Sequence, residues 1–203
     1  MRLIAITPET PCTTEAECLR EVQMLATILD AGFHFAHVRK PGYTEQQMRQ
    51  YLSAIPTEYH SRLKLHSHFA LLREFSLGGM HLNHRSPTLP GCIDATGLSI
   101  SRSCHSLEEL KTASECDYAF LSPIFDSISK RGYGSAFALA ELQQFFDRNP
   151  QCRNAVALGG VTPEHLRELK ACGFAGAAFL GYLFNAKDAT ELNNRISKIK
   201  SYL

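Results

Sequence analysis

The sequence has almost no excess of charge of either sign. Its 21 lysine and arginine residues are matched by 20 aspartate and glutamate residues, which leaves a net charge of +1. Proteins that are attracted to nucleic acids or to charged membrane surfaces rely on a clear excess of one sign. The chain also lacks any apolar run close to the roughly 18 residues of a membrane-spanning helix. We therefore expect no nucleic-acid partner and no membrane span.

Paired cysteine motifs are also missing. The seven cysteines are scattered, and none of them forms a Cys-x-x-Cys pair. An odd, unpatterned set in a chain of this length is typical of reduced thiols in a cytosol and not of a disulfide framework. The apolar part of the first stretch, MRLIAITPETPC, is too short for a signal peptide. These observations predict a cytoplasmic protein.

What the sequence does contain is a regular alternation of strand-like and helical patterns. Strand-like runs lie at residues 2–7, 33–40, 63–68, 79–83, 97–101, 117–122, 154–160 and 176–181. Helical spacing is found at 14–30, 44–52, 69–75, 105–114, 137–146, 163–171 and 189–202, whereas the loop after the fourth run shows no convincing helix. Eight such units predict an α/β fold, a (β/α)8 TIM barrel, with a doubly wound open sheet as the alternative. Because no linker divides the chain, we expect a single domain over residues 1–203.

Polar residues gather where the strand-like runs end, which is where a barrel of this kind carries its chemistry. The candidates there are His37, Arg39, His66, His68, His81, Asn83, His84, Ser101, Ser103 and Ser122. Strand alternation places His37 and Arg39 on one face and His34 on the other. We interpret His34, His60 and His165 as structural or surface histidines. The roles of His68, His81 and His84 stay open at this point.

The stretch SRSCHSLEEL places His105 between a strand and a helix. Ser106 with Glu109 three residues later fits a capping box, so the helix is expected to begin directly after the histidine. His105 would then lie at the barrel mouth. Imidazole titrates close to neutral pH, which makes His105 a candidate acid and base.

Glycines follow the last two strand-like runs and predict an anion site. Gly159 and Gly160 follow the seventh run, and Gly181 ends the eighth. Their amides can approach an anion closely, and barrels commonly bind phosphate at this place. The loop PIFDSISKRGYG adds the hydroxyls of Ser127 and Ser129 and the cation of Lys130, which we expect to close over a phosphorylated substrate.

Five segments together resemble the thiamine phosphate synthase / TenI superfamily: HVRK, GGMHLNHRS, SRSCHSLEEL, DYAFLSPIFDSISK and ALGGVTPEHLRELKACGFAGAAFLGYLF. The resemblance implies a (β/α)8 barrel that acts on a thiazole phosphate. One branch joins it to an aminopyrimidine pyrophosphate with Mg²⁺, and the TenI branch tautomerises the thiazole. SRSCHSLEEL and GGVTPEHLRELKACG look closest to the tautomerase branch.

Carried over residue by residue, the resemblance makes His105 the acid and base. Ser103, Ser127, Ser129 and Lys130 match positions that contact the phosphorylated ligands. Arg39 is kept from the synthase pattern, whereas His37 and His66 replace its Gln and Asn; we expect all three to contact the substrate, with the phosphate at Gly159, Gly160 and Gly181 as argued above. The two metal-binding aspartates of the synthase pattern fall on Ser67 and Ser86, and a serine hydroxyl is a poor anchor for Mg²⁺. We therefore predict a tautomerase with no metal and no cofactor, whereas a synthase would require Mg²⁺. The expected partner is a small-molecule thiazole phosphate, and a homodimer is left open.

Three alternatives remain at this stage. The first is the synthase itself. The second is a non-catalytic barrel that binds a thiamine-related phosphate, because a fold does not fix a function. The third is a metal-dependent hydrolase that uses His66, His68, His81 and His84.

Overall fold

Eight parallel strands close into a barrel in this computed structural model, which describes residues 1–203 except 90, 92 and 127–136. The barrel closes because β1 pairs with both β2 and β8. The strands are β1 (Arg2–Ile6), β2 (Phe35–Val38), β3 (Leu63–Leu65), β4 (Gly79–Leu82), β5 (Ser99–Cys104), β6 (Tyr118–Leu121), β7 (Ala155–Ala157) and β8 (Gly176–Phe179). The predicted (β/α)8 barrel is confirmed.

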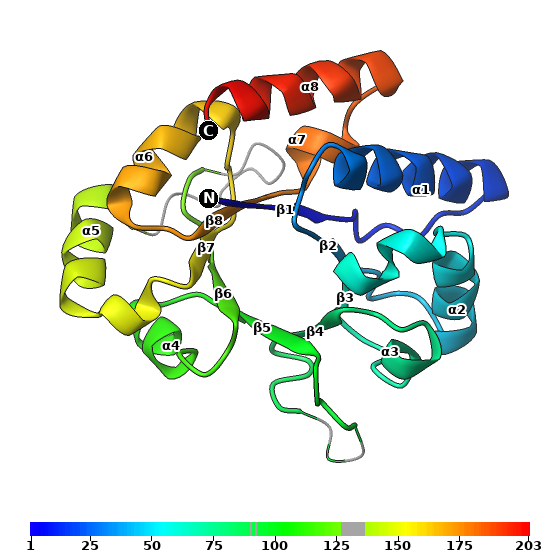
Figure 1. Ribbon diagram of the computed structural model, residues 1–203, viewed down its shortest axis with the longest axis horizontal. Coiled ribbons are helices and arrows are strands. Elements are labelled where there is room, and N and C mark those ends of the chain that lie inside the picture. The colour runs from blue at the N-terminus through cyan, green and yellow to red at the C-terminus, as the bar shows by residue number, and fades with distance from the viewer. Residues whose placement is uncertain (90, 92, 127–136) are drawn as a thin grey trace.

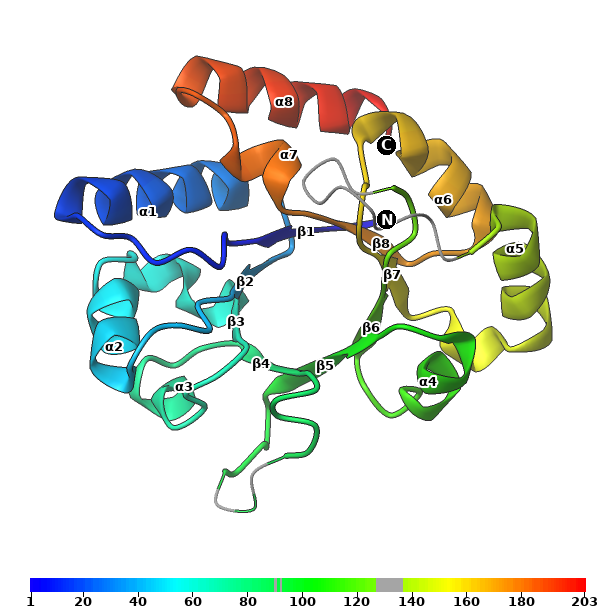
Figure 2. The ribbon, with the colours of Figure 1, turned by 180° about the vertical axis from the view of Figure 1, so that it is seen from behind.

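The helices surround the barrel on its outside (Figure 1). They are α1 (Glu15–Asp30), α2 (Glu45–Ser53), α3 (Leu71–Glu74), α4 (Leu107–Thr112), α5 (Leu139–Arg148), α6 (Leu166–Cys172), α7 (Gly181–Phe184) and α8 (Ala189–Ser201), with 3-10 turns η1 (Thr57–Arg62), η2 (Pro150–Cys152) and η3 (Pro163–His165). The described residues between β4 and β5 form no helix, as the sequence predicted. Figure 2 shows this connection extending away from the barrel.

Several helices begin at the residues that the sequence indicated. Thr44 caps α2, and its hydroxyl accepts a hydrogen bond from the N–H of Gln47. Ser106 caps α4 in the same way through the N–H of Glu109. The carboxylate of Glu109, however, accepts from the N–H of His105 at 2.7 Å and not from that of Ser106. The cap therefore fixes the backbone of His105 at the start of its helix.

The interior of the barrel is apolar on one side and polar on the other. Ile4, Ile6, Tyr118, Phe120, Val156 and Ala178 form a buried cluster from strands β1, β6, β7 and β8. On β2 to β5 the buried polar side chains are His37, Lys64, His81 and Ser101. Because alternate residues of a strand point inward, this division follows directly from the sequence of each strand. The polar side contains His37 and His81, which belong to the candidate site described below.

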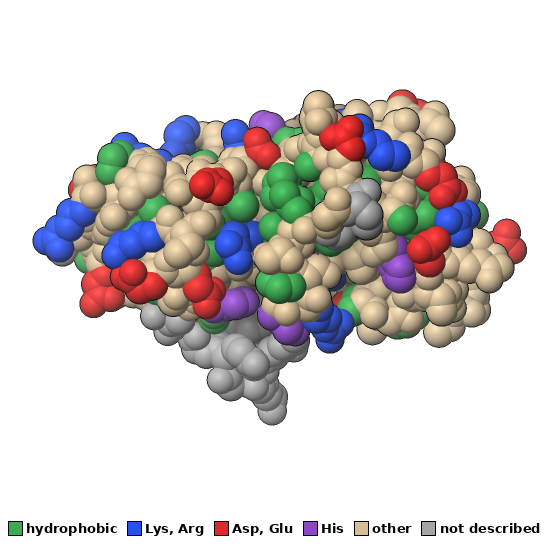
Figure 3. Space-filling model, turned by 90° about the horizontal axis from the view of Figure 1, so that it is seen from below, with side chains coloured by type: hydrophobic (Ala, Val, Ile, Leu, Met, Phe, Trp, Pro, Cys, Tyr) green, Lys and Arg blue, Asp and Glu red, His purple; other side chains and the backbone are tan. Residues whose placement is uncertain are grey.

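No helix among the described residues is long and apolar enough to cross a membrane. The side of the molecule drawn in Figure 3 carries acidic and basic side chains interspersed, without a large area of one sign. This agrees with the small net charge of the sequence.

Candidate functional site

Three histidines from neighbouring strands meet inside the barrel, near the C-terminal ends of the strands. His37 lies on β2, His66 directly after β3, and His81 on β4. Nδ1 of His37 is 2.9 Å from Nε2 of His66. The His66 and His81 rings stack with their centroids 4.2 Å apart. His37 and His81 are fully buried, and His66 is partly exposed.

Burial determines the charge of this cluster. Loss of water contact, followed by repulsion from Arg39, lowers the pKa of His81 to about 3. Burial first, and then the charge of His81, hold the pKa values of His37 and His66 well below their usual range. An imidazolium here would lose its hydration and face other cations, so all three rings are neutral at physiological pH.

Hydroxyl groups of β5 and β6 complete this cluster. Nε2 of His37 is 2.7 Å from the Tyr118 hydroxyl. Nδ1 of His81 is 2.9 Å from Oγ of Ser101, and its Nε2 is 2.8 Å from Oγ of Ser103. Tyr118 was not recognised from the sequence as a member of the site, and Ser101 was named only among the polar residues at the strand ends. The signal was present in the alternation of β5 and β6, which points Ser101, Ser103 and Tyr118 to the same interior as the histidines.

The four histidines of the hydrolase alternative do not come together. Nε2 of His68 lies 2.8 Å from the backbone oxygen of Tyr43, and His84 is exposed on the loop after β4. The nitrogens of His37, His66 and His81 lie within 4.8 Å of one another. However, the two stacked rings, inclined by 26°, cannot both direct a nitrogen at one ion about 2 Å away. Both nitrogens of His37 and of His81 are already hydrogen-bonded, so the arrangement fits a hydrogen-bond network better than a metal site.

His105 lies at the barrel mouth, exposed, directly after β5. Its Nδ1 is 3.0 Å from the backbone oxygen of Ser122, which follows β6. A carbonyl oxygen can only accept, so in the neutral ring Nδ1 carries the proton and Nε2 offers a lone pair. No described residue bonds to this Nε2. Among the described residues, the geometry therefore leaves the Nε2 lone pair of His105 without a partner at the barrel mouth.

The side chains of Arg39 and Lys40 point to different places in the structure, although the two residues are adjacent in the sequence. Arg39 is half-exposed at the mouth, with its guanidinium 2.9 Å from the carboxylate of Glu9. Lys40 is fully buried between α1 and α2, where its ammonium lies 2.7 Å from the carboxylate of Glu21. Only Arg39 is placed to reach a ligand. The sequence analysis did not predict that Glu9 lies at the mouth, because nothing in the pattern of the loop after β1 marks this residue.

The two glycines after β7 have a packing role that can be seen directly. Gly159 has φ +90° and Gly160 has φ +63°. A Cβ on Gly159 would lie 2.9 Å from Cα of Pro123, and one on Gly160 would lie 2.4 Å from the backbone oxygen of Asp126. They therefore let the loop after β7 contact the loop after β6. Gly181 begins the short helix α7.

Ser127, Ser129 and Lys130 lie outside the described residues. Ser67 and Ser86 are described, and neither supplies a carboxylate. Oγ of Ser67 is buried without a hydrogen-bond partner among the described residues, whereas Ser86 exchanges backbone hydrogen bonds with Asn83. Hydroxyl groups do not fit Mg²⁺, which prefers carboxylate and phosphate oxygens.

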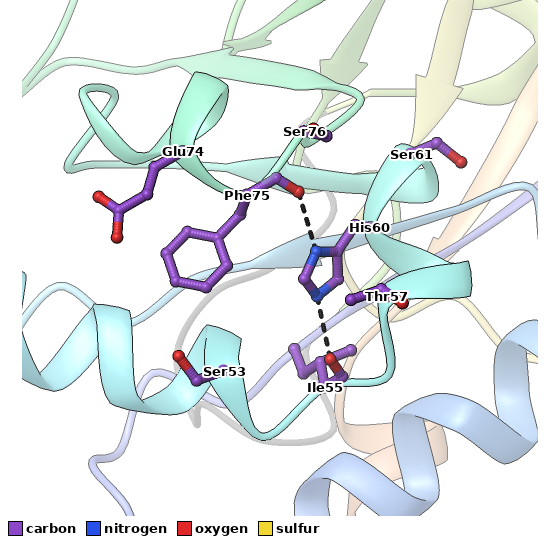
Figure 4. A pocket seen from close by; sticks show the side chains of 8 residues that line it. All are labelled: Ser53, Ile55, Thr57, His60, Ser61, Glu74, Phe75 and Ser76. Carbon is purple, nitrogen blue, oxygen red and sulfur yellow. Dashed lines mark hydrogen bonds between the residues drawn. The ribbon is translucent and has the colours of Figure 1, made fainter.

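A surface pocket of about 530 Å³ lies away from the mouth, between the end of α2, η1 and the end of α3 (Figure 4). His60 lines it, with one ring nitrogen 2.9 Å from the backbone oxygen of Phe75 and the other 2.9 Å from that of Ile55. His60 therefore links two segments of the helical layer. His34 and His165 likewise accept backbone hydrogen bonds, from Leu3 and Thr162.

Comparisons with known proteins agree on one family. A family model described as thiamine monophosphate synthase matches residues 3–183. The thiamine-phosphate synthase of Lactococcus lactis subsp. cremoris (strain MG1363) is 26% identical over 184 residues, covering 86% of this chain and 84% of that protein. That of Actinobacillus pleuropneumoniae serotype 7 (strain AP76) is 26% identical, covering 95% and 94%. The crystal structure of thiamine phosphate pyrophosphorylase from Bacteroides thetaiotaomicron superposes with a TM-score of 0.82 at 32% identity, covering 100% of this chain and 97% of that one.

Proposed function

Because this chain belongs to the thiamine monophosphate synthase family, we propose that it acts on a thiazole phosphate, and that it tautomerises the thiazole by acid and base catalysis. The observation that carries the proposal is the position of His105. Its Nδ1 is directed at the backbone oxygen of Ser122, and its Nε2 has no hydrogen-bond partner among the residues that the structure describes. One histidine held in this way can take a proton from one ligand atom and return it to another.

The donor set at the mouth favours proton transfer over condensation. A synthase must neutralise the charge of departing pyrophosphate, and Mg²⁺ is suited to that task. The positions that correspond to the metal-binding aspartates carry Ser67 and Ser86. The mouth carboxylate of Glu9 is paired with Arg39. Tautomerisation forms no pyrophosphate and needs no metal ion.

The phosphate of the ligand is assigned to the amides of Gly159, Gly160 and Gly181. This proposal relies on their place after β7 and β8, where barrels commonly bind phosphate. Ser127, Ser129 and Lys130 are proposed to add hydroxyl and ammonium contacts. On the opposite side of the mouth, Arg39, His66 and Ser103 are proposed to contact the ring, with His37 behind His66 as a positioning residue.

The names of the relatives favour a second candidate, thiamine phosphate synthesis. Both curated relatives and the Bacteroides structure bear the name of that activity. The two candidates share the thiazole phosphate and differ in the second substrate and in the need for Mg²⁺. They can be separated by experiment.

The test is to follow conversion of the non-aromatic thiazole phosphate to the aromatic tautomer by ultraviolet absorbance. We expect turnover by the wild type without a metal ion, and a loss of about 10²–10⁴-fold in kcat for both His105→Ala and His105→Asn. His34→Gln, at the opposite end of the barrel, serves as the control. Unchanged turnover in both His105 variants would contradict the assigned role. Efficient Mg²⁺-dependent condensation would select the synthase, and tight binding without either reaction would select the binder.

A further inference from the structure

Three side chains form a hydrogen-bonded series in the barrel interior, which runs from β6 through β2 to the residue after β3. The Tyr118 hydroxyl lies 2.7 Å from Nε2 of His37, and Nδ1 of His37 lies 2.9 Å from Nε2 of His66. We refer to these three residues as the Tyr118–His66 series. Tyr118 and His37 are buried, whereas His66 is partly exposed. The series therefore begins in the closed interior and ends at a side chain that solvent reaches.

The hydroxyl of Tyr118 sets the direction of these hydrogen bonds. A phenol keeps its proton at neutral pH. Among the described residues, the geometry gives this proton one acceptor, Nε2 of His37. A proton that pointed elsewhere would be buried without a partner, which is costly. The hydroxyl of Tyr118 therefore donates to His37.

Counting protons along the series then leaves one arrangement. A neutral imidazole has one N–H and one bare nitrogen, and burial keeps both rings neutral by holding their pKa values well below the usual range. Because Nε2 of His37 accepts from Tyr118, the proton of His37 is on Nδ1 and is donated to Nε2 of His66. The proton of His66 is then on Nδ1 as well, and no described residue bonds to it. His66 therefore ends the series as a hydrogen-bond donor.

The neighbouring group of Ser101, His81 and Ser103 is separate, and its direction is not set in this way. The Ser101 hydroxyl lies 2.9 Å from Nδ1 of His81 and 3.3 Å from the backbone oxygen of Met80. Because it has a choice of two acceptors, His81 is compatible with both neutral tautomers. Of the two groups, the Tyr118–His66 series alone has a fixed direction.

We propose that Tyr118 is a positioning residue that acts through His37 to make His66 a permanent hydrogen-bond donor, and that this donor selects a ligand with a bare ring nitrogen. The inference rests on the proposed function, in which His66 contacts the ring. A thiazole carries such a nitrogen, and Nδ1–H of His66 orients the ring by donating to it. A ring in which that nitrogen is protonated or replaced by C–H would place a hydrogen against the hydrogen of His66.

A fixed donor also suits the reaction proposed for His105. Removal of a C–H proton that is conjugated with a C=N bond places negative charge on the nitrogen, and a donor already directed at that atom stabilises the charge. His105 takes the proton at Nε2 and returns it to a second ligand atom. The ligand thus loses one proton and gains one, and His66 keeps its own proton throughout.

The first test reads the tautomer of His66 without a ligand, in protein labelled with ¹⁵N-histidine at neutral pH. The ¹⁵N shifts distinguish a protonated ring nitrogen from a bare one, and comparison with His66→Gln identifies the signals of His66. We expect the proton on Nδ1 in wild type and a mixture of both tautomers in Tyr118→Phe, which removes the hydroxyl and keeps the ring that stacks on Phe35. Ser101→Ala, which removes a buried hydroxyl bonded to His81, is the matched control and should leave the proton of His66 on Nδ1. A proton on Nε2 of His66 in wild type, or the Nδ1–H tautomer alone in Tyr118→Phe, would overturn the proposal.

The second test compares, by calorimetry, the affinity for the aromatic thiazole phosphate with that for its thiophene analogue, in which C–H replaces the ring nitrogen. One hydrogen bond corresponds to about tenfold in affinity, so the wild type should favour the thiazole by about that factor. The preference should fall below about threefold in Tyr118→Phe and stay at about tenfold in Ser101→Ala. Equal affinities in wild type would overturn the role of His66 as the donor to the ring. A fixed His66 tautomer in a protein that binds neither compound would reject the proposed function and keep the assignment of Tyr118 as the positioning residue.

Discussion

The burial of three neutral histidines predicts an unusual sensitivity to mild acid. Each imidazole is protonated below a pH of about 6.5 in the unfolded chain, but His81 has a folded pKa of about 3, and the pKa values of His37 and His66 are also well below the usual range. The unfolded state therefore binds more protons between these pKa values. Stability must rise with pH in that window, and it is lost as the pH falls below about 6.5.

The size of the loss follows from linkage. At pH 5.5 His81, with a folded pKa of about 3, costs about 1.4 kcal/mol, and His37 and His66 add to this loss in the same direction. At pH 5 the loss from His81 alone is about 2 kcal/mol, a large fraction of the 5–15 kcal/mol that is typical of the whole stability of a protein. Burial also lowers the pKa values of His34 and His165, which adds to the loss in the same direction.

The assay is urea unfolding followed by circular dichroism at pH 7.0, 6.0, 5.5 and 5.0. The free energy of unfolding should decrease steeply below pH 6.5, before the carboxylates are protonated. His66→Gln removes one titrating ring and should reduce the slope of the free energy of unfolding against pH, whereas His84→Gln, on an exposed loop, should leave it unchanged. A free energy that stays constant between pH 7 and pH 5 would refute the assignment of a neutral, buried cluster.

Two further predictions concern stability elsewhere in the barrel. Glu21→Gln leaves the fully buried ammonium of Lys40 without its counter-charge and should lower the free energy of unfolding at pH 7 by about 3–5 kcal/mol. A loss below about 1 kcal/mol would show that the ammonium of Lys40 is hydrated in the variant. Gly160→Ala combines a φ of +63° with a Cβ at 2.4 Å from the backbone oxygen of Asp126 and should cost about 2–3 kcal/mol in the same measurement. Gly42→Ala, whose Cβ would meet only Pro11 at 3.7 Å, is the control and should change stability by less than about 0.5 kcal/mol.

The sequence was sufficient to predict the barrel because its strands and helix caps are local features. Thr44 and Ser106 cap their helices through residues three positions later, as their spacing indicated. The position of His105 followed from the same local argument, since a strand and a cap on either side leave the histidine only the mouth. Short-range patterns of this kind do not depend on what the rest of the chain does.

The interior of the site depends on packing between strands and could be predicted only in part. His37 was placed on the same strand face as Arg39, but its burial behind His66 follows from the register between β2 and β3. His68 follows His66 by two residues, yet the strand ends at Leu65, and φ of +54° at His68 turns it toward the backbone of Tyr43. Simple alternation fails there because the residues after a strand no longer follow its period.

The acid sensitivity and the neutral state of the cluster follow from one physical condition. Burial inside the barrel holds the imidazoles of His37, His66 and His81 in the neutral form. The same burial makes the unfolded chain the better proton acceptor below a pH of about 6.5, so stability is lost in mild acid. Replacing His37 with Gln removes one of the buried rings and should therefore make the free energy of unfolding less dependent on pH between about 6.5 and 5. A His37→Gln variant with the same dependence on pH as the wild type would show that the sensitivity to acid originates elsewhere in the protein.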